Sequence, residues 1–395
     1  MTDDPVRAAL AEAATERAAI LATLIRVTGD WELAEDCVQD AVERALSAWP
    51  VEGVPASPAG WLTTVARHRA IDLLRRRATE RAKLQEVALM DEPETSPEDL
   101  LRLVFTCCHP ALQVEARVAL TLRTVAGLST AEIAHAFLVA EPTMSQRLRR
   151  AKGKIAHARI PYRVPAPEQL AERTGGVLAV LYLVFNEGYG RRDGDLAAEA
   201  LRLSRLLVDL MPSEDEARGL LALLLLQQAR RATRFDRNGD LVPMEEQDRS
   251  RWDEAMVAEG LWHLRRAGSS GRPPGPYRLQ AAIAACHVEA VDAASTDWAR
   301  IVELYDALAV AQPSPVIELN RAIASGFLNG FEAGLEALDG LDAALTGYYL
   351  LPAARGDFLR RLGRSAAART AYTAALGLAP GETERRLLER RLAEL

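Results

Sequence analysis

The chain has 395 residues, of which 49% are apolar and 26% are charged, and its formal net charge is −7. This composition is that of a soluble folded protein with room for two to four domains, and the charge excludes a chain that is basic throughout. Four cysteines, two of them adjacent, do not make a disulfide framework and suit a reducing cytoplasm. The N-terminus lacks the basic region of a signal peptide. The longest apolar runs, Val177–Phe185 and Leu220–Leu226, are far shorter than the roughly 20 residues that span a bilayer, so we expect a cytoplasmic protein without a membrane anchor.

Helices are expected nearly throughout the chain, which predicts an all-α fold. Ala, Leu, Arg and Glu dominate, aromatic residues make up only 5%, and apolar residues recur at spacings of three and four. Three breaks interrupt this pattern: a Pro/Gly loop at Trp49–Pro58, an acidic stretch at Glu86–Asp99 and a proline-rich stretch at Ile160–Pro167. They predict one small helical domain at residues 1–83, a flexible linker at 84–97, a second small domain at 98–158 and a helical extension at 168–395.

The first domain contains an acidic helix, expected over Ala34–Ala45. Helical spacing directs its apolar side chains toward a core and leaves four polar side chains on the outer face. These four are Asp36, Gln39, Asp40 and Glu43. From the residues alone, an ordinary solvated helix explains this pattern better than a docking surface does.

Positive charge is concentrated in two segments. Arg67–Lys83 holds seven Lys or Arg residues against Asp72 and Glu80, and Glu141–Arg159 holds six against Glu141 alone. Two basic helices on small domains, joined by an acidic tether, indicate two contacts with one polyanion such as DNA. Taken singly, either segment is more simply a solvated helix face.

The stretch Phe105–Pro110, FTCCHP, brings two thiols and an imidazole together. The apolar residues that lead into it at helical spacing are Leu100, Leu101, Val104, Phe105 and Cys108. Adjacent cysteines diverge by about 100° on a helix and lack the spacing of zinc ligands, whereas a buried cysteine behaves as a small hydrophobe. We therefore favour core packing for Cys107 and Cys108 over redox sensing, and both of these over a metal site. No metal ligand set is expected elsewhere.

The second basic segment has the layout of a helix-turn-helix. Ser129 and Glu132 form a capping box that begins one helix. A short turn, Leu138–Ala140, precedes a second helix with Pro142 in its first turn. The inward stripe of this second helix is Met144, Leu148 and Ala151. A helical hairpin that packs on a neighbour is the alternative, but the agreement of cap, turn, stripe and basic face favours DNA binding.

The second helix of such a motif enters the major groove with its N-terminal residues over the base edges. Thr143, Ser145 and Gln146 are short polar candidates for base contacts, and Arg149 could reach guanine. Phosphate contacts position a protein on DNA without specifying sequence. The candidates for phosphate contacts are Arg147, Arg150, Lys152 and Lys154.

Three segments together resemble a known family. Gly29–Ala45 and Pro58–Arg76 resemble region 2 of bacterial sigma-70-type RNA polymerase sigma factors of the extracytoplasmic-function (ECF) class, and the helix-turn-helix with EPTMSQRLRRAK looks like their region 4. They cover about residues 10–158 in the right order and separation. The resemblance implies a protein that binds core RNA polymerase and promoter DNA and directs the polymerase to promoters. It implies no enzyme activity and no cofactor.

The resemblance also implies roles for individual residues. The acidic helix would dock on the clamp helices of the polymerase through the four outer polar residues, and the second helix of the helix-turn-helix would read the −35 element. The helix from Trp61 to Arg77 would read the −10 element, and the loop Val51–Ser57 would help hold a base pulled from the melting duplex. The candidates for −10 contacts are Trp61, Arg67, His68, Asp72, Arg75 and Arg76. The family usually has asparagine where this chain has His68.

The extension at 168–395 goes beyond the usual length of the family and resembles a subgroup with a tetratricopeptide-like helical domain. Tyr305–Pro313 and Tyr372–Pro380 share the same Tyr-to-Pro spacing and lie 67 residues apart, about twice the roughly 34-residue repeat. Such arrays leave a concave surface for a partner, where a regulatory protein or a ligand is expected.

Polar stretches in the extension allow two interpretations. Asn186–Tyr189, Asp248–Asp253 and Pro274–Arg278 either line one ligand or peptide site or form turns and inter-helix salt bridges, and we favour turns and salt bridges. Asp236–Asp240 departs from a calcium loop in the position of its glycine and in its twelfth residue, so calcium binding is not expected.

The function predicted from the sequence is therefore a sigma factor whose C-terminal array regulates or supports its activity. The alternative is a stand-alone helix-turn-helix regulator with a ligand- or peptide-sensing array. Such a regulator would bind duplex DNA without core polymerase. An enzyme within the extension has little support, because it shows no Gly-rich phosphate loop, metal constellation or nucleophile motif.

Overall fold

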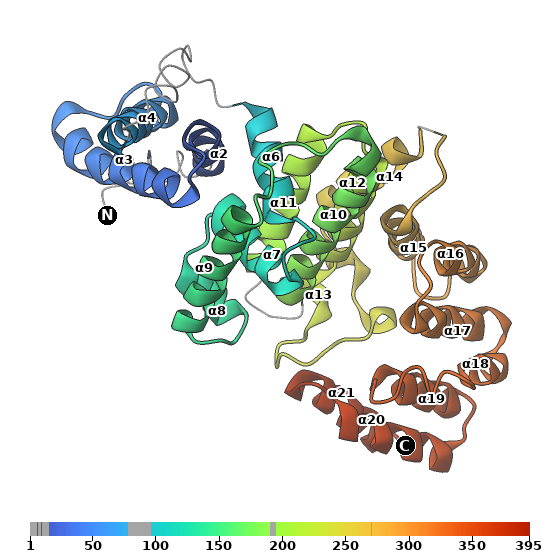
Figure 1. The fold of residues 1–395 in the computed structure, drawn as a ribbon. Helices are drawn as coiled ribbons and strands as arrows, with labels where there is room; N and C mark the ends of the chain where they lie inside the picture. Colours follow the sequence, from blue (N-terminus) through green and yellow to red (C-terminus); the bar gives the residue numbers. More distant parts are fainter. Residues whose placement is uncertain (1–5, 7–8, 10–15, 78–95, 190–194, 270) are drawn as a thin grey trace. The chain divides into compact units, whose positions relative to one another are not determined.

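The computed structural model describes residues 6, 9, 16–77, 96–189, 195–269 and 271–395. Helices dominate these residues, and the only β-pairing among them is one isolated bridge between Phe235 and Leu241 (Figure 1). The all-α prediction is confirmed. The chain forms two compact units, Met1–Glu187 and Gly188–Leu395, so the first unit ends within helix α10 (Pro167–Tyr189). In the part of the chain that is described, no helix is long and apolar enough to cross a membrane.

Among the described residues of the first unit, α2 (Arg17–Thr28), α3 (Trp31–Glu52) and α4 (Pro58–Arg77) pack on one another. Asp30 caps α3 by accepting a hydrogen bond from the Leu33 amide at 3.1 Å. Trp49 at the end of α3 is buried and meets Trp61 of α4 edge to face, with ring centroids 5.5 Å apart.

The loop predicted over Trp49–Pro58 is wrong at its beginning. Helix α3 continues through Pro50 to Glu52, because the ladder resumes one turn later with a 3.0 Å hydrogen bond from the Gly53 amide to the Trp49 carbonyl. Gly53, with φ of 88°, then ends the helix in a conformation that favours glycine. The connection to α4 is therefore shorter than the sequence indicated.

The remainder of the first unit contains the helix-turn-helix and its support. Its elements are α6 (Pro97–Cys107), α7 (Val114–Thr121), the π-helical turn η1 (Leu122–Ala126), α8 (Thr130–Ala136), α9 (Glu141–His157) and the first part of α10. Ser96 caps α6 through the Glu98 amide at 3.2 Å, so Ser96 and Pro97, expected in the linker, begin a helix. The rest of the predicted linker, 84–95, lies outside the described residues.

The FTCCHP stretch lies at the end of α6 and packs into the core. Phe105, Cys107 and Cys108 are all buried, and the Cys108 thiol lies 3.5 Å from the Thr121 hydroxyl. The apolar stripe is shifted from the predicted one, since Leu103 rather than Leu101 is fully buried. Burial raises the pKa of the Cys107 thiol well above its usual value and that of Cys108 to about 11. The packing interpretation is confirmed, and both thiols stay protonated at neutral pH.

Alkylation of Cys107 and Cys108 by iodoacetamide at pH 8 should be at least about 100-fold slower in the folded chain than in urea, because reaction requires an exposed thiolate. The half-buried Cys286 is an internal reference in the same sample. Peptide mass spectrometry over time would measure each rate. Labelling of Cys107 as fast as that of Cys286 in the folded protein would contradict the packing interpretation.

The second unit is a succession of helices that follows the end of α10. These are α11 (Asp195–Leu210), α12 (Asp215–Gln228), α13 (Arg231–Arg234), the short turns η2 (Met244–Glu246) and η3 (Arg249–Arg251), α14 (Glu254–Gly268), α15 (Pro276–Glu289), α16 (Trp298–Ala311), α17 (Pro315–Asn329), α18 (Phe331–Leu338), α19 (Leu350–Arg361), α20 (Ser365–Leu378) and α21 (Glu382–Ala393). From α15 onward each helix packs against the next in sequence, as expected for a helical-hairpin array.

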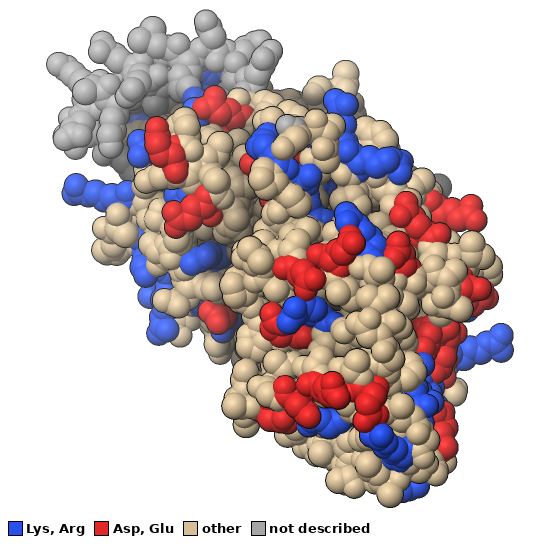
Figure 2. Space-filling view, turned by 90° about the vertical axis from the view of Figure 1, so that its right-hand side faces the viewer, with Lys and Arg blue, Asp and Glu red and all other residues tan. Residues whose placement is uncertain are grey.

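The polar stretches Asp248–Asp253 and Pro274–Arg278 mainly form turns and bridges, as favoured from the sequence. Asp253 caps α14 through the Met256 amide at 2.9 Å, and Glu216 accepts hydrogen bonds from the Gly275 and Tyr277 amides. On the face shown in Figure 2, acidic and basic side chains are intermingled over the lower part. Ion pairs between separate elements of the array, such as Arg364 at the start of α20 with Glu332 of α18 at 2.9 Å, fit this mixture.

Helices α19 and α20 pack closely because α19 has a glycine, Gly356, where it meets Tyr372 of α20. A Cβ added to Gly356 would lie 2.8 Å from the ring of Tyr372, which is 2% exposed. Gly356→Ala should therefore lower the free energy of unfolding of the second unit by about 1–2 kcal/mol through overpacking. Gly377→Ala is the matched control, because a Cβ there meets nothing within 4 Å and alanine favours the helix. Thermal unfolding would measure both, and equal shifts in the two variants would refute the close contact.

Candidate nucleic-acid and polymerase interface

The helix-turn-helix is built as the sequence predicted. The Ser129 hydroxyl accepts a hydrogen bond from the Glu132 amide at 3.1 Å, and the Glu132 carboxylate accepts one from the Ser129 amide at 2.7 Å, which lowers the pKa of Glu132. Leu138 lies in the turn with φ of 51°. The inward stripe of Met144, Leu148 and Ala151 is buried, so the orientation of α9 is fixed by its core face.

The outer side of α9 carries the predicted DNA contacts. Exposed side chains on it are Thr143, Ser145, Gln146, Arg149, Arg150 and Lys154, while Arg147 is half-buried. At 100° per residue, Gln146, Arg149 and Arg150 point most directly away from the buried stripe. A shallow hollow lies between α9 and the start of α7, lined on the α9 side by Thr143, Gln146, Arg147, Arg150 and Lys154.

Lys152 differs from its basic neighbours because it is already paired. Its Nζ lies 2.5 Å from Glu35 Oε2 on α3, and both side chains are largely buried. Lys152, predicted to contact a DNA phosphate, is therefore paired with Glu35 of α3 in this structure. The local sequence could not have indicated this pair, since its members are 117 residues apart.

The outer face of α3 presents most of the predicted polymerase contacts. Asp36, Gln39 and Glu43 are exposed, and the Gln39 amide donates to Glu43 Oε1 at 3.0 Å. Asp40 is half-buried and accepts a 2.6 Å hydrogen bond from Arg69 Nε of α4. Leu46, one turn beyond Glu43, is 51% exposed and extends this face with apolar surface. The sequence prediction did not include Leu46, although its spacing of three from Glu43 and seven from Gln39 places it on the same face.

The predicted −10 contacts lie along α4 in different environments. His68, Asp72 and Arg75 are exposed, Arg67 is half-buried, and the side chain of Arg76 lies outside the described residues. Trp61 is half-buried against Trp49, so part of its ring packs in the core and only the remainder is accessible to DNA. Before α4, Val51 and Val54 are exposed, at 85% and 37%, which leaves apolar surface beside the start of this helix.

The two halves of the first unit are joined around a buried carboxylate. The Asp99 side chain, 2% exposed, accepts hydrogen bonds from Arg26 Nε of α2 at 2.8 Å and from Arg102 of its own helix at 3.0 Å. The Tyr162 hydroxyl, whose pKa is raised by burial, donates to the Ala22 carbonyl at 2.9 Å. The −10 and −35 candidates are thus carried by bundles that pack on each other.

Helix α10, where the extension begins, is seated on the helix-turn-helix support. Arg173 Nη2 donates to the Phe105 carbonyl at 2.8 Å, and its guanidinium lies 6.0 Å from the Phe105 ring centroid. Burial is the main cause of the lowered pKa of Arg173.

The described part of the structure offers no metal site at His109. The His109 imidazole accepts a hydrogen bond from the Ala111 amide at 3.2 Å. Across the described ranges, no three His, Cys, Asp or Glu side chains gather where they could hold a metal ion.

Comparison with protein families matches three parts of the chain. Residues 14–80 match sigma-70 region 2, residues 102–155 match sigma-70 region 4, and residues 173–268 match a family of unknown function, DUF6596. A match to region 2 followed by a match to region 4, which here holds the helix-turn-helix, defines the class of sigma-70-type sigma factors. No solved structure matches the chain.

Comparison with individual proteins gives the narrower family. The chain is 38% identical over 154 residues to the ECF RNA polymerase sigma factor SigL of Mycobacterium tuberculosis, which covers 36% of this chain and 86% of SigL. It is 30% identical over 182 residues to the probable ECF sigma factor SigI of the same species, covering 43% of this chain and 61% of SigI. It is also 44% identical to the uncharacterized protein R00370 of Rhizobium meliloti, across 95% of this chain and 93% of that protein. The chain belongs to the ECF sigma factors, with a C-terminal extension that includes the DUF6596 match.

Proposed function

We propose that the chain docks on core RNA polymerase through the outer face of α3. The residues that would make this contact are Asp36, Gln39, Asp40 and Glu43. Three of them are exposed on one side of a helix whose other side is buried, and exposed Leu46 continues that side with an apolar contact. The polymerase would carry out the chemistry, so the chain itself needs no catalytic group.

On this proposal α4 reads the −10 element and α9 reads the −35 element. Trp61, Arg67, His68, Asp72, Arg75 and Arg76 would lie along the melting DNA, and the exposed segment before α4 would help capture an unstacked base. The single observation that carries the −35 assignment is the exposed polar and basic outer side of α9 over a fully buried core stripe. Residues 1–83 would then form region 2, 84–97 the linker, 98–158 region 4 and 168–395 the extension.

In vitro transcription with purified core polymerase tests this function. The chain should support initiation from a subset of promoters in a fragment library, and core polymerase should be retained in a pull-down. Gln39→Ala combined with Glu43→Ala should reduce polymerase retention but leave the helical content of the chain unchanged. Binding of promoter duplex without any polymerase retention would instead identify a stand-alone regulator.

We further propose that the extension regulates or supports the activity of the N-terminal regions, in place of or together with a separate partner. The contact of Arg173 with Phe105 favours this proposal, because it joins a helix of the extension to α6, which packs on the α7 and η1 support of the helix-turn-helix. Deletion of residues 168–395 should change transcription output in vitro or its control in cells. Equal output and equal control with and without the extension would refute the proposal.

A further inference from the structure

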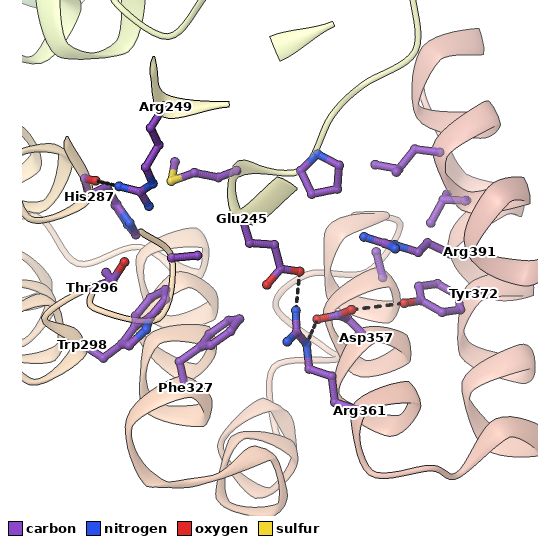
Figure 3. A pocket seen from close by; sticks show the side chains of 16 residues that line it. Glu245, Arg249, His287, Thr296, Trp298, Phe327, Asp357, Arg361, Tyr372 and Arg391 are labelled. Atoms are coloured by element: carbon purple, nitrogen blue, oxygen red, sulfur yellow. Dashed lines mark hydrogen bonds and ion pairs between the residues drawn. The ribbon is translucent and has the colours of Figure 1, made fainter. Parts of the chain in front are cut away.

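A cavity of about 310 Å³ lies within the second unit, lined by the segment after α13 and by residues of α15 to α17 and α19 to α21 (Figure 3). One wall is aromatic: Trp298 and Phe327 stack with ring centroids 4.3 Å apart and planes within 10°, and His287 meets Trp298 edge to face. Pro243 and Met244, in the segment after α13, also line the cavity. Volume and lining fit the lower end of small-molecule sites, which span about 300–1,000 Å³ and are mostly apolar with a few polar groups.

One end of the cavity is lined by ion pairs whose charges compensate one another. Arg361 pairs with Glu245 at 2.5 Å and with Asp357 at 2.6 Å, and its guanidinium lies 5.0 Å from the Phe327 ring centroid. Asp240 and Glu246 of the same segment pair with Arg386 and Arg391 of α21. These pairs hold the segment against α19 and α21. Each charged side chain named here has a partner of opposite charge.

At the opposite end, the Arg249 guanidinium binds backbone carbonyl groups and an aromatic ring instead of a carboxylate. Arg249 Nη1 donates to the backbone carbonyls of His287 and of Ala290, the latter at 2.8 Å, and its guanidinium lies 4.8 Å from the Trp252 ring centroid. Within the described ranges, no carboxylate forms a hydrogen bond or ion pair with Arg249. His287 beside it is neutral at pH 7, because burial, Arg230 and Arg249 lower its pKa to about 4. Arg249 and the half-buried Arg230 supply the positive charge at this end, and the Asp292 carboxylate offsets part of it without pairing directly with Arg249.

We propose that this cavity is a binding site for a small aromatic anion, with its ring against Trp298 and Phe327 and its acid group on Arg249. Stacking against a Trp–Phe pair favours a planar apolar body. A guanidinium whose Nη1 is already used retains Nη2 and Nε, which match the two oxygens of a carboxylate or sulfonate. The carboxylates at the other end disfavour a second acid group there. Every lining residue lies in the second unit, outside the residues proposed to contact DNA and polymerase.

Two matched fluorescent probes test the site on the full chain. 1-Anilinonaphthalene-8-sulfonate carries the acid group, and N-phenyl-1-naphthylamine is the same aromatic body without it. The sulfonate should bind saturably with one site per chain and at least about 10-fold more tightly than the neutral probe, as a charge-assisted hydrogen bond predicts. Arg249→Ala should remove this difference, and Trp298→Ala should weaken both probes.

Two further variants keep the test decisive. Arg251→Ala removes an exposed arginine two residues from Arg249 that does not line the cavity, and it should bind both probes as the unaltered chain does. Ala293→Trp adds a large side chain to the cavity lining and should abolish binding of both probes, even if Arg249→Ala fails to fold by circular dichroism. Equal affinity for the two probes, unsaturable binding, or unchanged binding in Ala293→Trp would overturn the proposal.

Discussion

Asp99→Ala should destabilise the first unit by about 2–4 kcal/mol. Removing one member of a buried ion pair costs about 3–5 kcal/mol when the partner stays buried. Here the two partners, Arg26 and Arg102, are each 25% exposed, so water recovers part of that cost. The loss should appear where the carboxylate joins α2 to α6. Hydrogen exchange read by mass spectrometry would show it as faster exchange of amides in both helices, with α16 to α21 unaffected.

Asp36→Ala is the matched control for this prediction. It removes the same side chain from an exposed position of α3, where a substitution should change stability by no more than about 0.5 kcal/mol. Asp99→Asn separates charge from shape, because it keeps a hydrogen-bond acceptor for Arg26 but removes the negative charge. Unchanged exchange in α2 and α6 of the Asp99→Ala chain would show that the carboxylate does not hold these helices together.

The same residue marks the limit of what the sequence could predict. In the sequence, Asp99 ends the acidic stretch Glu86–Asp99, and its acidic neighbours indicate a solvent-exposed carboxylate rather than a buried one. Its partner Arg26 is 73 residues away, and nothing local to either residue indicates the pair. The same holds for Lys152 with Glu35, and for Arg361 with Glu245 in the cavity. Ion pairs across helices depend on how helices pack, and single-sequence patterns do not specify that packing.

Features set by local rules were predicted well. The capping box at Ser129 and the buried stripe of α9 need only spacing within one or two turns of helix, and both are present as expected. The burial of Cys108 followed from the same periodicity, whereas Cys107, also buried, was not part of the predicted stripe. The end of α3 was misjudged because a proline usually stops a helix, whereas here the hydrogen-bond ladder resumes after Pro50.

The sharpest test of the −35 assignment compares two cations on α9. Arg149 is exposed and points away from the buried stripe, whereas Lys154 lies one turn beyond it on the flank toward α7. If Arg149 reads a base edge, Arg149→Ala should weaken binding to the preferred duplex by about 1–3 kcal/mol, or roughly 5–150-fold, and leave binding to unrelated duplexes nearly unchanged. If Lys154 contacts a phosphate, Lys154→Ala should weaken all duplexes alike and reduce the slope of log K against log salt by about one.

The preferred duplex for this comparison can be selected from a randomised pool with the unaltered chain bound to core polymerase. The discriminating quantity is the ratio of specific to non-specific affinity, measured at several salt concentrations, because phosphate contacts alone would change both affinities together. A fall in this ratio for Arg149→Ala but not for Lys154→Ala would place base reading on the outer side of α9. Equal ratios in both variants would mean that Arg149 only positions the helix, and base reading would then have to come from Thr143, Ser145 or Gln146.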